Sequence, residues 1–139
     1  MAIPLKRWTV NKLRECPGWQ WRGLETKILN HLVKGGKEQT VTLVSLPPKK
    51  SLPYIQHKKT HEWSLVVQGS LEAVLDGKKV KLKKFDFLYL PPNVWHSFTA
   101  GSKGVTALSV YSPPLKWNNV DVNFKGLKGP VSLKIRGMK

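Results

Sequence analysis

The sequence predicts an all-β fold, an antiparallel β-barrel formed by a single domain over residues 1–139. Three observations support this prediction: helical periodicity is almost absent, apolar residues alternate or form short blocks, and turn residues recur roughly every ten positions. A chain of 139 residues can enclose one hydrophobic core without disulfide bonds. Its hydrophobic content of 40% and its six Trp are typical of a packed globular protein.

In the first third of the chain the pattern predicts one short helical turn and then a hairpin. Residues 9–15 are compatible with a helical turn, and residues 23–32 and 39–46 alternate as strands do, with Gly35-Gly36 as the turn between them. Pro47-Pro48 should end the second strand, because proline offers no donor to the hydrogen-bond ladder. A loop through Pro53 is expected to follow.

The remaining barrel strands are expected at residues 63–67, 71–75, 85–90, 95–99 and 105–111, with a short strand around Val80. Gln68-Gly69-Ser70 is interpreted as a tight turn, and Asp76-Gly77 is the dipeptide that best fits a type I′ hairpin. The barrel core would thus cover about residues 40–111. A C-terminal extension over residues 112–139 keeps a period of two at 120–122 and 131–135, which predicts an added edge strand.

The net charge is +16, from 24 basic and 8 acidic residues, so the chain should attract anions over long range. The basic residues are spread along the chain and form no pattern typical of DNA recognition. No long apolar run is present, which predicts a cytoplasmic protein that does not span a membrane. The single Cys16 cannot form an intramolecular disulfide and is expected to be buried or inert.

Three of the four histidines lie beside strands that should pair within one small sheet. Two imidazoles and one carboxylate on a single face suit Fe(II), Mn, Ni or Zn and leave coordination positions open, and His57, Glu62 and His96 can supply that set. His61 adjoins Glu62, so strand alternation should turn it to the opposite, outer face. A distorted strand start is the alternative that would bring it inward. His31 is expected to be structural or exposed.

The spacing of these residues resembles the first motif of the cupin superfamily. That motif places a His-x-His pair, three or four residues, a Glu, six residues and a Gly. Ile55-Gln56-His57, Glu62 and Gly69 follow this spacing without an insertion, with Ile55 in place of the first His.

The second cupin motif is matched in part. It runs Gly, five residues, Pro-x-Gly, two residues, His, three residues and Asn. Pro91 and His96 match it, whereas Phe85 and Asn93 stand at the two glycines and Ala100 stands at the final Asn. Asn tolerates the left-handed backbone that glycine adopts easily. The chain is most similar to single-domain cupins such as the sensor half of anti-sigma factors and acetophenone-cleaving dioxygenases.

The resemblance implies a double-stranded β-helix, or jelly-roll, with its ligand site inside the barrel. The metal would make this a metal-dependent enzyme, a dioxygenase or isomerase, acting on a small anionic organic substrate. His61 and Tyr89 are the candidate bases. Ile55, Trp95 and Phe98 are the candidate pocket residues, and the other aromatic side chains expected in the core or pocket lining are Trp63, Phe87 and Tyr89.

Two other functions remain open from the sequence. A metal-free cupin that binds or senses a small ligand would explain the loss of a ligand at Ile55. A basic module that binds anions or nucleic acid would explain the net charge. A homodimer is expected in addition, because terminal strands would otherwise leave exposed sheet edges.

Overall fold

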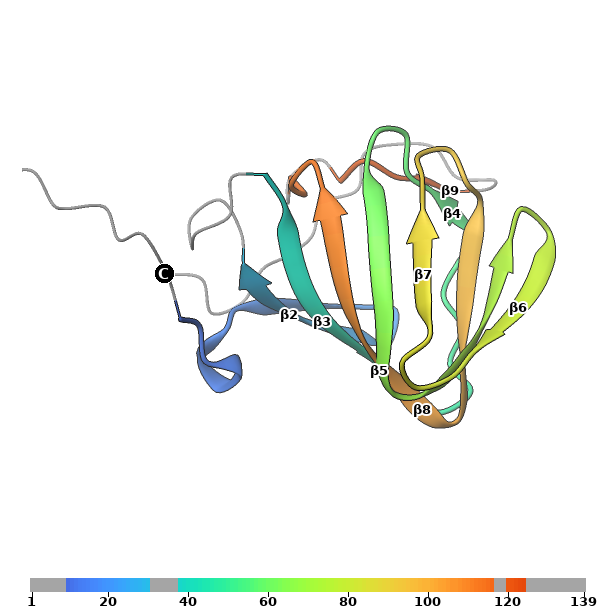
Figure 1. Ribbon diagram of the computed structural model, residues 1–139, viewed down its shortest axis with the longest axis horizontal. Helices are drawn as coiled ribbons and strands as arrows, with labels where there is room; N and C mark the ends of the chain where they lie inside the picture. Colours follow the sequence, from blue (N-terminus) through green and yellow to red (C-terminus); the bar gives the residue numbers. More distant parts are fainter. Residues whose placement is uncertain (1–9, 31–37, 117–119, 125–139) are drawn as a thin grey trace, which may run out of the picture.

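The computed structural model describes residues 10–30, 38–116 and 120–124. In these residues, nine strands form one antiparallel sheet that curls on itself (Figure 1). The all-β antiparallel barrel predicted from the sequence is therefore confirmed. The strands are β1 (Gly18–Trp21), β2 (Leu24–Asn30), β3 (Thr40–Leu46), β4 (Ile55–Gln56), β5 (His61–Leu75), β6 (Lys78–Leu82), β7 (Phe87–Leu90), β8 (His96–Ser112) and β9 (Asn123–Phe124).

Two long strands, β5 and β8, hold the barrel together. They pair with each other from His61 opposite Ser112 to Leu75 opposite His96, so each contributes to both halves of the curled sheet. β3 joins the C-terminal part of β8, and β7 and β6 join successive parts of β5. Figure 1 shows β3, β8, β5 and β7 side by side across one wall. The inner face of this wall carries the candidate site.

The tight turn predicted at Gln68-Gly69-Ser70 is wrong, since β5 continues through these residues and bends there. The register shifts between Gly69 and Leu71 mark the bend. Gly69 has a positive φ of 75°, and a Cβ at this position would overlap the carbonyl of Gly104 on β8. Glycine is needed because two backbones approach closely at the bend. The strands predicted at 95–99 and 105–111 are likewise one strand, since β8 runs without a break from His96 to Ser112.

The turn predicted at Asp76-Gly77 is confirmed. Leu75 pairs with Lys78 across it, and both turn residues have positive φ, 46° and 85°, as a type I′ turn requires. β6 pairs with β5 alone in the described residues, and its exposed residues include three lysines that protect this sheet edge from pairing with another chain. These lysines are Lys78, Lys79 and Lys81.

The N-terminal elements follow the prediction with one addition. A 3₁₀ turn, η1 (Leu13–Glu15), lies within the predicted helical stretch, and β2 pairs antiparallel with β3 as expected. β1 was not predicted from the sequence. The turn at Gly35-Gly36 and the period-two stretch at 131–135 lie outside the described residues, as does His31. β9 adds a strand beside β4, directly after the predicted segment 120–122.

Two hydrophobic clusters fill the barrel. One surrounds the bends of β5 and β8, and its buried members are Leu46, Val66, Leu71, Ala73, Leu82, Ala100 and Val105. The other joins the N-terminal and C-terminal segments through Trp19, Ile28, Leu115 and Val120. Cys16 is buried and free, as expected. No helix in the described part of the chain is long and apolar enough to cross a membrane.

Candidate metal centre

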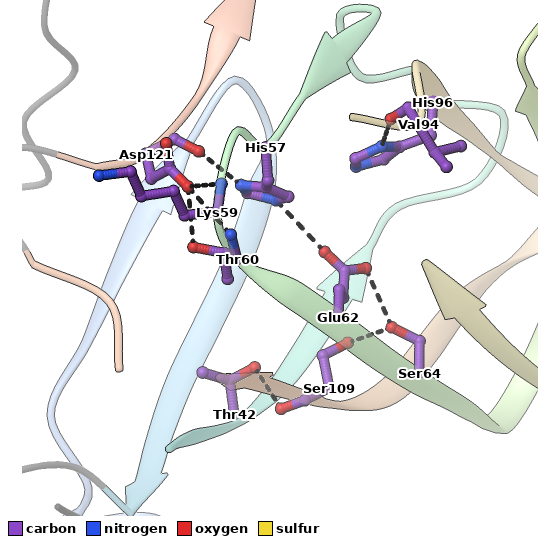
Figure 2. A network of polar contacts seen from close by, with 10 residues as sticks. All are labelled: Thr42, His57, Lys59, Thr60, Glu62, Ser64, Val94, His96, Ser109 and Asp121. Atoms are coloured by element: carbon purple, nitrogen blue, oxygen red, sulfur yellow. Dashed lines mark hydrogen bonds and ion pairs between the residues drawn. The ribbon is translucent and has the colours of Figure 1, made fainter. Parts of the chain in front are cut away.

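The structure brings His57, Glu62 and His96 together inside the barrel (Figure 2). Each offers one ligand atom, and these atoms lie within 4.8 Å of one another. All three side chains are buried, with exposed fractions of 6%, 4% and 2%. Three ligating groups in this spacing and burial fit a single divalent metal ion.

Local strand geometry places each of the three residues. Glu62 is the second residue of β5 and points inward, as its burial beside partly exposed neighbours shows. His96 begins β8 and lies opposite Ile55 of β4. His57 follows β4 directly, so the end of this short strand brings its ring to 5.5 Å from that of His96. Ile55 thus stands beside the metal centre, where the family pattern has an imidazole.

Backbone carbonyls fix both imidazole rings in the same tautomer. His57 Nδ1 donates to the carbonyl of Asp121 at 2.8 Å, and His96 Nδ1 donates to the carbonyl of Val94 at 2.9 Å. Since the Nδ1 atoms carry these protons, both Nε2 atoms can present a lone pair to a cation. Metal-binding histidines usually have such a second hydrogen bond, so the arrangement fits a metal ion.

His57 and Glu62 form a buried ion pair. His57 Nε2 lies 3.5 Å from Glu62 Oε1. Burial, the largest influence, lowers the pKa of His57, but the hydrogen bond and charge of Glu62 outweigh it and raise this pKa above 6.5. Burial raises the pKa of Glu62, but His57, His96 and Ser64 outweigh it and hold that pKa below 4.5. Glu62 is therefore a carboxylate, ready to bind a cation.

His96 and Tyr111 are held neutral beside this pair. Burial lowers the pKa of His96 below 6.5, although the charge of Glu62 opposes the shift. Burial, helped by the charge of Glu62, raises the pKa of Tyr111 well above 10. A neutral imidazole is the form that binds a metal. The phenol of Tyr111 remains a hydrogen-bond donor inside the barrel.

Asp121 fastens the C-terminal segment to the loop that carries His57. Its carboxylate accepts hydrogen bonds from the backbone N–H of Lys59 at 2.6 Å, the backbone N–H of Thr60 at 3.0 Å and the hydroxyl of Thr60 at 3.1 Å. Burial opposes ionisation, but these bonds outweigh it and lower the pKa of Asp121. Figure 2 shows Asp121 beside this loop, with its carbonyl toward His57 and its carboxylate toward Lys59 and Thr60. The same residue therefore orients His57 and holds its loop.

The two candidate bases lie on the other side of the sheet. His61 Nδ1 is 2.7 Å from the Tyr89 hydroxyl, and both rings stack with Trp63 on the outer face. Tyr89 is 43% exposed and Phe87 58% exposed, so the prediction that these aromatic residues line the core or pocket is wrong. Strand alternation explains the result, because residues next to Glu62 and Leu90 must face outward. Neither His61 nor Tyr89 reaches the metal centre.

The predicted pocket residues divide in the same way. Ile55 and Phe98 line the interior cavity with the three metal-site residues. Trp95 does not line that cavity, and it stacks instead on Tyr54 at 5.8 Å in a separate surface depression. The backbone N–H of Trp95 donates to the carboxylate of Asp76 at 3.0 Å, in the turn between β5 and β6.

Sequence reasoning missed several polar residues of the site. Ser64 donates to Glu62 at 3.1 Å and shares a hydrogen bond of 2.8 Å with Ser109. Ser64, Ser109 and Tyr111 all lie at even spacings from inward residues, so strand alternation could have found them. No sequence pattern indicates Asp121, because its role depends on how the C-terminal segment folds back.

The backbone keeps the shape of both motifs, although two of their three glycines are replaced. Gly69, Phe85 and Asn93 occupy the motif's glycine positions and have positive φ values of 75°, 72° and 73°. The left-handed conformation expected for Asn93 is present, and Phe85 adopts it despite its side chain. The turns that lead into β7 and β8 thus have the geometry of the motif.

Comparison with known structures gives cupin folds. KdgF from Halomonas sp. has a TM-score of 0.61 and 25% identity, covering 68% of this chain and 84% of that one. Streptomyces Pac13, described as a nucleoside dehydratase and solved with uridine, has a TM-score of 0.72 and 15% identity, covering 92% and 95%. A Bacillus subtilis oxalate decarboxylase variant has a TM-score of 0.67 and 15% identity, covering 79% of this chain and 30% of that one.

Curated protein sequences give no significant match. A family model described as the cupin domain matches residues 42–111, half of the chain, and includes both motifs and all three metal-site residues. With the curled antiparallel sheet and the buried His and Glu cluster, this match shows that the chain belongs to the cupin superfamily.

Proposed function

We propose that this protein is a metal-dependent cupin enzyme that binds one divalent transition metal through His57, Glu62 and His96 and acts on a small organic molecule. The observation that carries the proposal is the pair of buried imidazoles, each held at Nδ1 by a backbone carbonyl, with the Nε2 atom of His57 3.5 Å from the Glu62 carboxylate. Two purely structural histidines would not need to place their ligand atoms together beside the Glu62 carboxylate. Two histidines and one carboxylate also leave coordination positions for a substrate and for water or O₂.

The protein residues supply a buried site held by hydrogen bonds. Glu62 provides negative charge, and the hydroxyl of Ser64 holds its second oxygen at 3.1 Å. Tyr111 adds a neutral donor, and its ring centroid lies 6.1 Å from that of His57, with the two rings at 70°. A bound divalent metal would supply Lewis-acid polarisation of a substrate oxygen, and an iron ion would add O₂ chemistry. Dioxygenase and isomerase reactions are the two classes that this donor set supports.

A metal-free cupin that binds a small ligand is the second candidate, and Ile55 favours it. Ile55 lines the cavity beside His96, so the coordination sphere has an apolar group on one side. Three ligands bind a metal less tightly than four would. The ion pair of His57 with Glu62 also satisfies both groups without a cation.

Two assays on metal-loaded protein test the proposal. The protein is incubated with Fe(II), Mn or Zn and a set of small carbonyl compounds, and O₂ consumption reports dioxygenase activity. Exchange of carbon-bound hydrogen with deuterated solvent, followed by NMR, reports isomerase activity. Either activity should be lost in Glu62→Gln and kept in His61→Ala, whose imidazole lies on the outer face. Equal activity in parent and Glu62→Gln would overturn the proposal.

A further inference from the structure

The interior cavity is polar at one level and apolar at the next. The inward residues of β5 and β8 face one another in successive pairs, so polarity can be followed along the two strands. The pairs are Glu62 with Tyr111, then Ser64 with Ser109, then Val66 with Ala107. All six line the cavity. A ligand that reaches the metal centre therefore extends from polar groups into an apolar compartment.

The apolar compartment is built from the first hydrophobic cluster. β3 continues the apolar level through Val44, opposite Ala107, and Leu46, opposite Val105. Other apolar side chains close it from β5, β6, β7 and the loop before β4. The members that line the cavity are Leu24, Leu46, Leu52, Val66, Leu71, Leu82, Leu88, Phe98 and Val105.

The charge of the cavity is the opposite of the charge of the chain. The net charge is +16, yet the described residues that line the cavity include no lysine or arginine, and Glu62 is their one carboxylate. A ligand with several anionic groups would find no lysine or arginine here, and His57 is already paired with Glu62. A ligand with many hydroxyls would bury most of them without partners, which is unfavourable.

The size of the cavity limits the ligand further. Its volume is about 130 Å³. A buried apolar cavity of about 150 Å³ in another protein holds one benzene molecule. The enclosed space therefore fits about one six-membered ring.

We infer that the ligand is a compact molecule of about one ring, with an apolar body in the Val44, Val66 and Ala107 compartment and one polar head group at the metal centre. The inference deepens the proposed function and rests on it, because the polar head group is directed by the proposed metal ion. It replaces the expectation of an anionic substrate, which drew on the net charge of the whole chain. The basic residues act at the surface, whereas the cavity lining selects the ligand.

Three probes with the same six-carbon ring test this inference. Cyclohexanol has one hydroxyl, myo-inositol has six, and cyclohexanecarboxylate has one negative charge. Binding is measured by ligand-observed NMR titration, once with Zn and once with a chelator. Cyclohexanol should bind in both conditions, at least about ten-fold more tightly than myo-inositol. Without metal, the carboxylate should bind more weakly than cyclohexanol because it faces Glu62.

Two cavity variants locate the bound ring. Ala107→Leu fills the apolar compartment and should abolish cyclohexanol binding while leaving metal binding intact. Thr106→Leu is the matched control, since the same side chain is added one residue away on the outer face. Phe98→Ala should enlarge the cavity and admit the two-ring alcohol decahydro-2-naphthol, which the parent should not bind. This second variant keeps the test decisive if Ala107→Leu does not fold.

The outcomes separate the ligand inference from the metal proposal. If cyclohexanol binds with chelator and no metal binds, the apolar compartment is supported and the proposed function fails. If metal binds but myo-inositol binds as tightly as cyclohexanol, the proposed function stands and the ligand inference is overturned. The inference is also overturned if the metal-free protein prefers cyclohexanecarboxylate, or if Phe98→Ala and the parent bind the two-ring alcohol equally.

Discussion

Removal of the Asp121 carboxylate should weaken both the fold and the metal centre. Asp121→Ala deletes the acceptor of three hydrogen bonds from Lys59 and Thr60, two of them from backbone N–H groups. The carboxylate is half-buried and water can replace part of this bonding, so we expect a loss of about 2 kcal/mol in the free energy of unfolding. The segment would no longer be fixed to the loop, and the carbonyl that orients His57 would be released.

The metal affinity should fall by roughly 10- to 100-fold, the usual effect of losing a group that orients a metal ligand. Urea unfolding gives the stability, and competition with a chelator gives the metal affinity. Asp86→Asn is the control, since Asp86 accepts a hydrogen bond from the Lys83 N–H in a turn that is not part of the metal centre. The control should change stability alone. An Asp121→Ala variant that binds metal as tightly as the parent would refute the role of Asp121 in orienting His57.

The effect of Asp121 on stability should also depend on pH in a defined direction. The pKa of Asp121 is lowered below 3.8 in the folded protein. The carboxylate therefore stabilises the fold above about pH 3.8, and this contribution is lost as the pH falls through the folded pKa. Parent and Asp121→Ala should converge in stability in acid. A constant difference at every pH would contradict the charge-assisted bonding.

Three further predictions concern the site and its turns. Ile55→His should raise metal affinity at least about ten-fold by adding a ligand beside His96, as measured by chelator competition, and unchanged affinity would contradict the placement of Ile55. In metal-free protein, NMR titration should give His57 a pKa above 6.5 and His96 a pKa below it. His57→Ala should then destabilise the fold most below pH 6.5, where the charged ring stabilises it. His96→Ala should destabilise the fold most above pH 6.5, where its ring is neutral. The same pH profile for both variants would be inconsistent with the ion pair. Phe85→Gly should raise the free energy of unfolding by about 1 kcal/mol in urea, because Phe85 is 69% exposed and held at a φ of 72°.

The sequence was sufficient for the fold class and for the residues that gather in the barrel. Alternation of apolar residues predicted most strands, and the spacing of His57, Glu62 and His96 predicted that they would meet. Alternation also predicted that His61 would face away from Glu62. The structure agrees, and it places Tyr89 on the same outer face, so neither suits the role of base.

The predictions that failed concern features that depend on long-range packing. Gly69 was interpreted as a turn because glycine marks both turns and bends, and only the approach of Gly104 from β8 distinguishes them. Trp95 was assigned to the pocket because it precedes His96, but its ring stacks on Tyr54 in a separate surface depression. Asp121 was missed because it lies 64 positions from His57 in the chain, and no local pattern connects the two.

Partner binding remains a set of predictions. The homodimer was expected from exposed sheet edges, but the lysines on β6 disfavour pairing at that edge. Nucleic-acid contact would use the basic surface and should weaken steeply with salt, which a binding titration at two ionic strengths tests directly. Binding that is absent or independent of salt would eliminate that function.

The central claim is that His57, Glu62 and His96 form one metal site. The most direct test is elemental analysis of protein loaded with Fe(II), Mn, Ni or Zn and then desalted, for the parent, Glu62→Gln, His96→Ala and the outer-face control His61→Ala. We expect about one equivalent per chain in the parent and the control, and under about 0.1 equivalents in the other two. A parent that retains no metal, or a Glu62→Gln variant that retains as much as the parent, would contradict the claim.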